Sequence, residues 1–386
     1  MSARLARPLH PLAWWLWALG LAATTSRTTN VLTLLMFAGV ACCVVSFRRS
    51  DAPWAQGFGF YLRLGLIIIA IRVAFRVLLG GSHGTTVLFT LPELQLPDAA
   101  AGIRLGGPVS LEAILGAVYD GVRLATLLLC LGAANMLADP KRLLKSLPAA
   151  LHELGVAVTV ALMVAPQLVA SSQRIRRARR LRGADGRAGG VIHGVIVPVL
   201  EDALDRSLVL AAAMDSRGYG RSAGQPRRVR QITSLLVLGG VVGVCVGTYG
   251  LLDSSTPRLL GAPMLVGGCV LAVVGIRWAG RRVQRTVYRP DPWLLPEWAV
   301  VACGLAAAAL MFATSSIDPN GAYPALQPLS WPTVGVLPLV AALLGVLPAW
   351  LAPPVRAAAP APADEPTESS VGDHASALAA NRGAPR

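Results

Sequence analysis

Nine long apolar windows alternate with polar or basic segments along the chain. An α-helix needs roughly 20 apolar residues to cross a bilayer, and most of the windows approach that length. The windows fall at positions 11–25, 31–47, 58–79, 111–137, 155–170, 232–252, 260–276, 298–313 and 334–351. This pattern predicts an all-α, polytopic membrane protein.

Basic residues between the windows predict on which side of the membrane each segment lies. Segments rich in Arg and Lys remain cytoplasmic, so Arg4 and Arg7 place the N-terminus inside. Alternation from there places the pair at 48–49 inside, the loop at 80–108 outside and the basic residues at 141–145 inside.

The window at 155–170 breaks this alternation. If it crossed the membrane, the basic cluster at 174–187 would lie outside. Because it has only about 16 residues and contains Pro166, we interpret it as an interfacial or half-inserted helix. About eight spans remain, with cytoplasmic helices between the fourth and the fifth, and with both termini inside.

These spans divide the sequence into four predicted regions. They are a four-span region with an outer loop at 80–108 (1–137), a cytoplasmic or interfacial region (138–231), a second four-span region (232–351) and a disordered Pro/Ala-rich tail (352–386). In the outer loop, an alternating segment at 86–91 and the turn residues Gly106 and Gly107 predict a short hairpin or a partly ordered cap.

The composition supports a membrane protein. Hydrophobic residues make up 54% of the 386 residues, and charged residues only 14%. The formal net charge of +15 could indicate a nucleic-acid partner, but few aromatic residues accompany the basic clusters. We therefore expect the lipid bilayer, and no nucleic acid, as a partner.

Motifs for catalysis or cofactor binding are absent from the sequence. It contains no G-x-x-x-x-G-K-[ST] loop for phosphate, no H-E-x-x-H pair and no G-x-S-x-G elbow. The six cysteines lie in apolar runs and the five histidines are scattered singly. We therefore predict no catalytic residue, no metal site and no cofactor.

Three charged residues within the predicted spans are interpreted as structural. Arg72 and Arg76 lie one turn apart in the third span, and Asp120 lies in the fourth. At about 1.5 Å per residue, Arg72 and Asp120 fall at similar depth. An ion pair that fixes the packing of the two spans is favoured over a polar substrate path, because the acidic residues are too few to form a relay.

Two predicted helices between the fourth and fifth spans each end in an Arg-Gly pair. The pairs are Arg182-Gly183, which closes a basic segment starting at Gln173, and Arg217-Gly218. A glycine after the last turn suits the left-handed C′ position, which holds the arginine near the negative end of the helix dipole. Each helix therefore offers a fixed cation to the aqueous phase.

The second of these helices has the pattern of a docking helix with a cationic tip. Asp202 and Arg206 can pair at i, i+4, and Arg206 and Arg217 lie nearly in phase on one face. Apolar and small residues at 208–214 lie between them.

The two motifs together resemble those of the transmembrane T component of energy-coupling factor (ECF) importers. Its signature is a pair of short Ala-Arg-Gly motifs at the ends of cytoplasmic coupling helices. Residues 178–183 (ARRLRG) match the first motif and residues 213–219 (AMDSRGY) the second, with Leu181 and Ser216 where the family commonly has Ala. The resemblance covers roughly 9–230, and the three additional spans beyond about Leu252 carry either a second role or an elaboration of the fold.

The resemblance implies a non-catalytic subunit of an ATP-driven importer of vitamins or metal ions, such as cobalt, in the cell membrane. The partners it implies are two ABC-type ATPase subunits and a small membrane-embedded substrate-binding (S) subunit. The residues it assigns to ATPase coupling are Ala178, Arg182, Gly183, Ser216, Arg217 and Gly218.

Three alternatives are considered. A conventional ABC permease would carry a cytoplasmic E-A-A-x-x-x-G loop, which is not found. An integral-membrane lipid-modifying enzyme would need acidic, His or Ser residues in a cluster, but Glu201, Asp202 and Asp205 have no His or metal-ligand partner and fit helix N-terminal charges. A membrane scaffold without transport activity stays open on the residues alone.

Overall fold

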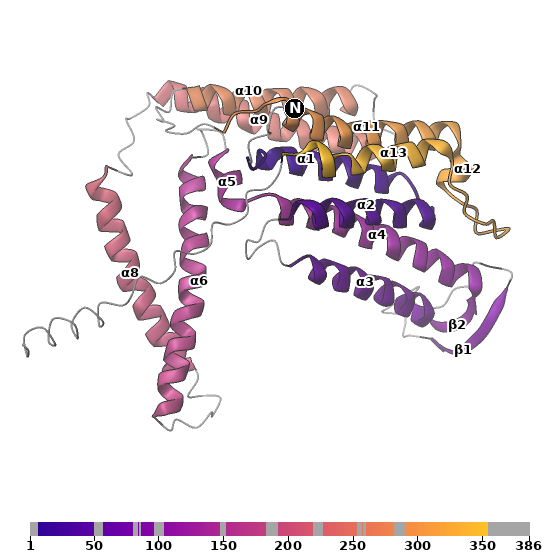
Figure 1. Ribbon diagram of the computed structural model, residues 1–386, viewed down its shortest axis with the longest axis horizontal. Coiled ribbons are helices and arrows are strands. Elements are labelled where there is room, and N and C mark those ends of the chain that lie inside the picture. The colour runs from indigo at the N-terminus through magenta and orange to yellow at the C-terminus, as the bar shows by residue number, and fades with distance from the viewer. Residues whose placement is uncertain are drawn as a thin grey trace, which may run out of the picture. The chain divides into compact units, whose positions relative to one another are not determined.

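The computed structural model describes residues 7–49, 57–79, 84, 86–95, 104–146, 152–182, 192–218, 227–252, 257, 260–281 and 291–353 (Figure 1). The chain forms two compact units. Unit 1 comprises Met1–Asp139 with Asp291–Arg386, and unit 2 comprises Pro140–Pro290. The predicted four-span region at 232–351 is thus divided between the two units, and residues 354–386 of the predicted tail lie outside the described residues.

Unit 1 is a helical bundle with one β-hairpin. Its elements are α1 (Pro11–Ser26), α2 (Val31–Arg48), α3 (Phe58–Leu79), β1 (Val87–Gln95), β2 (Arg104–Ser110), α4 (Leu111–Leu137), α11 (Leu295–Ile317), α12 (Pro319–Ala322), α13 (Val336–Val346) and α14 (Pro348–Leu351). Polar side chains cap the starts of several of these helices, α2 and α4 among them. Asn30 accepts hydrogen bonds from the backbone N–H groups of Leu32 and Thr33 in α2, and Ser110 accepts one from Ala113 in α4.

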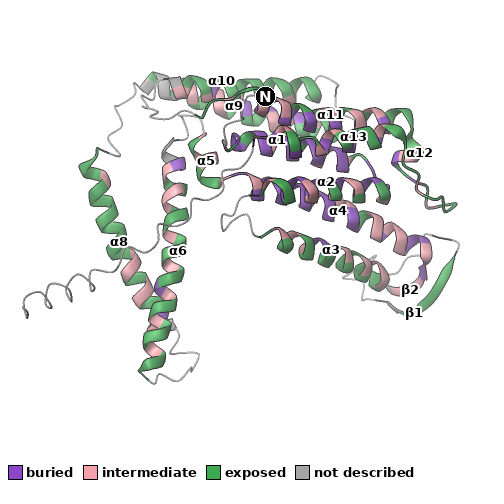
Figure 2. Ribbon diagram, viewed as in Figure 1, coloured by how far each residue is buried: buried purple, intermediate pink, exposed green. Residues whose placement is uncertain are grey.

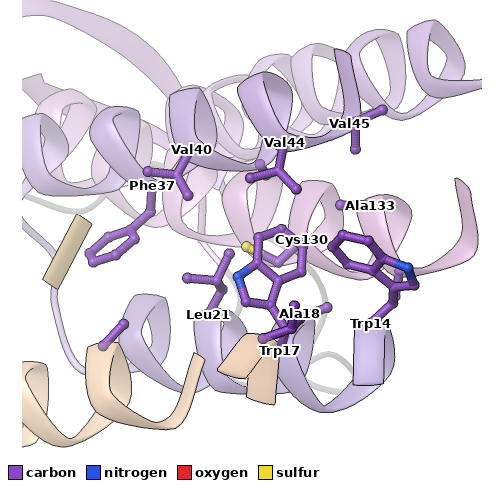
Figure 3. Close-up of a cluster of buried hydrophobic side chains, with 14 of the residues drawn as sticks. Trp14, Trp17, Ala18, Leu21, Phe37, Val40, Val44, Val45, Cys130 and Ala133 are labelled. Atoms are coloured by element: carbon purple, nitrogen blue, oxygen red, sulfur yellow. The ribbon is translucent and has the colours of Figure 1, made fainter. Parts of the chain in front are cut away.

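The core of unit 1 forms between α1, α2, α4, α11 and α13. Trp17, Leu21 and Phe37 have no exposed surface there (Figure 3). The indole N–H of Trp17 donates to the carbonyl oxygen of Gly345 in α13 over 3.0 Å. A large aromatic side chain can therefore be buried without leaving its polar atom unpaired.

Helices α1 and α11 approach each other so closely that only glycine fits between them. A Cβ atom on Gly20 would lie 2.5 Å from the carbonyl oxygen of Gly304, and one on Gly304 would lie 2.7 Å from Cα of Trp17. Small residues allow this approach, and close packing drives helix association in lipid, where apolar burial gives little advantage.

Polar contacts also join the α1–α2 connection to the segment after α11. Asn30 Nδ2 donates to the carbonyl oxygens of Gly321 (2.9 Å) and Thr333 (2.7 Å), and Thr28 Oγ1 donates to that of Ala322 (2.7 Å). Helices α11 and α13, whose role the sequence leaves open, thus complete the core of unit 1.

A buried carboxylate that the sequence analysis missed fixes the start of α11. Glu297 has no exposed surface and accepts hydrogen bonds from the backbone N–H groups of Leu294 (3.0 Å) and His10 (3.4 Å). It also forms an ion pair with Arg7, which lies 290 residues away in the sequence. A buried charge is tolerated when it is paired and hydrogen-bonded in this way.

The predicted hairpin is confirmed, because β1 and β2 pair in antiparallel fashion. The predicted turn is wrong. Gly106 and Gly107 lie inside β2, opposite a register irregularity between Leu91 and Leu94, with φ angles of 88° and 103°. A bulge of this kind needs left-handed backbone, which glycine adopts without steric cost.

The predicted ion pair between α3 and α4 does not form. Arg72 and Asp120 are both described and exposed, and no ion pair joins them. The two helices meet instead through Gly121, where a Cβ atom would lie 3.0 Å from Cα of Ile69. Asp120 precedes Gly121 by one residue, about 100° around the helix, so similar depth did not bring the charges together.

Unit 2 contains α5 (Pro140–Lys145), α6 (His152–Leu181), the π-helix η4 (Ile192–Ile196), α8 (Val197–Ser216), α9 (Arg227–Leu252) and α10 (Ala262–Arg281). Helices α9 and α10 form an antiparallel pair that packs through glycines. Successive α9 glycines meet α10 and the residues before it in reverse order: Gly240 with Ala272, Gly243 with Gly268, Gly247 with Leu265 and Gly250 with Leu260.

All eight predicted spans lie on helices, namely α1, α2, α3, α4, α9, α10, α11 and α13 with α14. Six helical segments within the described residues are long and apolar enough to cross a membrane: Val31–Arg48, Leu111–Leu137, Leu154–Leu181, Gln231–Leu252, Ala262–Gly280 and Leu295–Ile317. A shorter apolar helical segment covers Val336–Leu351. The third of the six belongs to α6, whose 30 residues join the apolar window at 155–170 to the basic helix predicted from Gln173. The number of spans stays a prediction.

Candidate functional site

Helices α6 and α8 carry the two Arg-Gly motifs and form an antiparallel crossing. The Arg179 guanidinium of α6 lies against Gly194 of η4, where a Cβ atom would be 2.3 Å from Cζ of Arg179. A second contact joins Ser171 and Asp202. Ser171 lies eight residues before Arg179 on α6, whereas Asp202 lies eight residues after Gly194. The contacts run in opposite directions along the two helices, so their C-terminal ends lie on opposite sides of the crossing (Figure 1).

Asp202 is the centre of the crossing. Its Oδ2 accepts a hydrogen bond from Oγ of Ser171 (2.6 Å) and lies 3.5 Å from Nη2 of Arg174, and its Oδ1 accepts from Nε of Arg206 (3.0 Å). The Ser171 hydroxyl, followed by Arg206, holds the pKa of the Asp202 carboxyl below its usual value. The carboxylate is therefore ionised at neutral pH. The predicted pair between Asp202 and Arg206 is confirmed.

The tip of α8 has the predicted C-terminal geometry. The helix ends at Ser216, Arg217 is the C-cap residue, and Gly218 has a φ of 77°. The N–H of Gly218 donates to the carbonyl oxygen of Asp215 over 2.9 Å, which is one of the two bonds of a Schellman motif. Ser216 lies in the last turn and donates through its hydroxyl to the carbonyl oxygen of Ala213.

The tip of α6 is described as far as Arg182. Its N–H donates to the carbonyl oxygen of Arg179 over 3.0 Å, and Ala178, Leu181 and Arg182 are all exposed. Gly183, assigned to the same motif, lies outside the described residues.

Both helices expose apolar faces. None of the described α8 side chains is buried, and α6 is also largely exposed (Figure 2). The large apolar side chains exposed on α6 are Leu154, Val158, Leu162, Met163, Val169 and Leu181, and those on α8 are Val197, Leu200, Leu204, Leu208, Val209 and Leu210. Apolar surface of this extent indicates contact with lipid or with another protein.

The structure brings together residues that sequence reasoning treated separately. Asp202 and Arg206 were expected to pair within one helix, but the bond to Ser171, 31 residues away, was missed. The available signal is that Ser171 and Ser172 are hydroxyl residues between the apolar and the basic halves of α6. Sequence alone does not reveal which of these faces a second helix.

Comparison with known proteins decides the family. The family model described as cobalt transport protein (CbiQ) matches residues 6–227, which is more than half of the chain. This chain belongs to the CbiQ family. The match includes the crossing of α6 and α8 with both Arg-Gly motifs, and it ends at the first residue of α9.

Curated relatives of this CbiQ family member are ECF transporter transmembrane proteins, named EcfT. The protein of Thermanaerovibrio acidaminovorans is 33% identical over 201 residues, which cover 47% of this chain and 74% of the relative. That of Thermotoga maritima is 27% identical over 220 residues, covering 49% and 80%. The protein is thus an ECF transporter T component, a multi-pass membrane protein that belongs to a complex with other subunits.

Proposed function

We propose that this T component transmits motion from two ABC-type ATPase subunits to a small membrane-embedded S subunit, and so drives uptake of a vitamin or a metal ion. The observation that carries the proposal is the antiparallel crossing of α6 and α8, which separates the two arginine tips. Arg182 lies eleven residues beyond Ser171, and Arg217 lies fifteen beyond Asp202. At about 1.5 Å per residue, the tips are up to about 39 Å apart, which favours two separate ATPase subunits.

Each tip suits an acidic groove on one ATPase. A guanidinium group forms paired, charge-assisted hydrogen bonds with carboxylates, and these resist the pull of a moving helix better than neutral bonds do. Arg182 and Arg217 are both exposed, and Gly218 fixes the backbone just beyond Arg217.

The exposed apolar faces of α6 and α8 would press on the S subunit. Closure of the ATPase pair on ATP would move the two tips, tilt the S subunit and deliver its solute inward. ATP hydrolysis belongs to the ATPases in this proposal, and solute selectivity belongs to the S subunit, so the T component itself has no catalytic role.

The charge pattern supports a cytoplasmic location of both tips and both termini in the plasma membrane. The tip of α6 follows a run with Arg174, Arg176, Arg177, Arg179 and Arg180, and such segments remain on the inner side.

The test is a charge reversal at both tips. In the double variant Arg182→Glu/Arg217→Glu, the amount of co-purified ATPase is expected to fall at least about tenfold. A charged hydrogen bond contributes roughly 1.5–3 kcal/mol, and the reversed charge would repel the acidic groove. The measurement is ATPase recovered per T component from detergent-solubilised membranes, together with uptake in cells.

The matched control is Arg228→Glu/Arg277→Glu, which makes the same change in net charge at two exposed arginines on α9 and α10, outside both tips. It is expected to retain the ATPases. Unchanged ATPase recovery with the tip variant would refute the assignment of Arg182 and Arg217.

The backbone at Gly218 gives a second prediction. Space around it is open, since a Cβ atom would meet nothing within 4 Å, but its φ of 77° is unfavourable for other residues. Gly218→Val adds about 1–2 kcal/mol of backbone strain, and is expected to weaken ATPase recovery by up to about 5- to 30-fold. Gly218→Asn, which tolerates left-handed backbone, is expected to remain close to wild type. Equal losses in the two variants would contradict this role of the backbone.

A further inference from the structure

We propose that Asp202 is a positioning residue that locks α6 to α8 at their crossing, so that the two arginine tips move as one body. The lock itself is a statement about this chain alone. Its consequence for transport rests on the proposed function.

The bond between Ser171 and Asp202 is the best-protected contact of the crossing. Ser171 is 1% exposed, whereas nearly all described side chains around it on α6 are exposed or half-buried. The 2.6 Å bond joins the two helices directly. None of the described side chains of α8 is buried, so α8 itself contributes little apolar packing to the crossing. The buried apolar side chain in the preceding η4 is Val195, which is 6% exposed.

The carboxylate also keeps two cations in place. Arg174 on α6 and Arg206 on α8 approach it from different helices, at 3.5 Å and 3.0 Å. Exposed ion pairs alone add little stability because water screens them. Here the same carboxylate accepts the Ser171 bond, so its removal leaves two guanidinium groups facing each other and a buried hydroxyl without its acceptor on α8.

Both arginine tips lie far from the crossing, so a small change in the angle between α6 and α8 moves them by a large distance. The tip of α6 lies about 16 Å from the crossing and the tip of α8 about 22 Å, at about 1.5 Å per residue. A change of about 10° in the crossing angle would move them by roughly 3–4 Å. Such a displacement exceeds the tolerance of a hydrogen bond, so a loose crossing would transmit ATPase motion poorly.

The test measures the distance between the tips in the full-length protein in lipid nanodiscs. Spin labels are placed at Leu181 and Ala212 through an unnatural amino acid, because the chain has six native cysteines. Wild type is expected to give a single narrow distance distribution. Asp202→Ala and Ser171→Ala are each expected to broaden or split it. The double variant is expected to add nothing beyond Asp202→Ala, because the bond that Ser171→Ala removes is already lost when the carboxylate is gone.

The matched controls are Asp205→Ala, an exposed carboxylate one turn along α8, and Ser172→Ala, whose hydroxyl bonds within its own helix to Val169. Both are expected to leave the distribution unchanged. Ser171→Thr keeps the hydroxyl and is expected to restore the narrow distribution that Ser171→Ala loses. Circular dichroism of each variant confirms that the helices are retained. Wild-type distributions in both Asp202→Ala and Ser171→Ala would overturn the lock.

A second measurement separates this inference from the proposed function. In a complex with ATPases, Asp202→Ala is expected to keep the ATPases bound but lose uptake per ATP hydrolysed, whereas the tip variants lose the ATPases. If wild type binds no ATPase, the proposed function fails, and the distance measurement still decides the lock. Wild-type uptake per ATP hydrolysed in Asp202→Ala would overturn the role of the lock in transport.

Discussion

Gly304→Leu is expected to separate α1 from α11 and to destabilise unit 1 by about 3 kcal/mol or more. Even a Cβ atom at this position would lie 2.7 Å from Cα and 2.8 Å from the carbonyl oxygen of Trp17. These are backbone atoms, which cannot rotate away as a flexible side chain can, so the helices themselves must move apart. Overpacking costs of 1–3 kcal/mol are typical even where side chains can adjust.

The consequences extend beyond the glycine contact. Trp17 would be displaced from its hydrogen bond to Gly345, so α13 would lose its polar tie to α1. The measurement is the temperature at which detergent-solubilised protein stops eluting as a monodisperse peak. Gly39→Leu is the matched control, because Gly39 is exposed on α2 and a Cβ atom there meets nothing within 4 Å. Equal stability of the two variants would contradict the close approach of α1 and α11.

Gly268→Leu is expected to open the α9–α10 pair, whereas Gly267→Leu is expected to leave it intact. A Cβ atom on Gly268 would lie 2.5 Å from the backbone nitrogen of Val244 and 2.6 Å from the carbonyl carbon of Gly243. On Gly267 it would meet nothing within 4 Å. The two residues are neighbours, so the variants share composition, hydrophobicity and helix propensity and differ only in the face that receives the side chain.

Hydrogen–deuterium exchange resolves this difference locally. With the helices apart, amides near Val244 lose the cover of α10, and the Gly268→Leu protein is expected to exchange faster along α9 than wild type or Gly267→Leu. We expect Gly268→Leu to cost the α9–α10 pair several kcal/mol of packing free energy. One leucine against backbone atoms displaces the contacts of all the glycines along α9 that face α10. Faster exchange in both variants would instead indicate that added bulk on α10 is not tolerated on any face.

The helices, and two details of the site, could be predicted because their causes are local. Apolar windows identify each predicted span as a helix. The left-handed Gly218 and the pair between Asp202 and Arg206 depend on residues within one helix end or one turn. The sequence analysis treated the apolar helix at 155–170 and the basic helix from Gln173 as separate, whereas α6 runs through both without a break, since arginine is a good helix former.

The contacts that fix how the helices pack against one another could not be predicted from the sequence, because they join residues that are distant in the chain. The bond from Ser171 to Asp202 and the ion pair from Arg7 to Glu297 each depend on how a helix is rotated about its axis against a partner. The failed ion pair of Arg72 and Asp120 shows the same limit, since depth along two helices was matched but rotation was not.

The position of α1 in the core also has a consequence for biosynthesis. Trp17 and its acceptor Gly345 are separated by 328 residues, so a ribosome adding about 5–20 residues per second needs roughly 15–65 s to make the partner after the helix itself. During that interval α1 lacks the close contact with α11 that Gly20 and Gly304 make possible. A nascent chain released before α11 and α13 are made would leave the side of α1 that faces these helices uncovered, although α2 and α4 are already present, and would be exposed to membrane proteases.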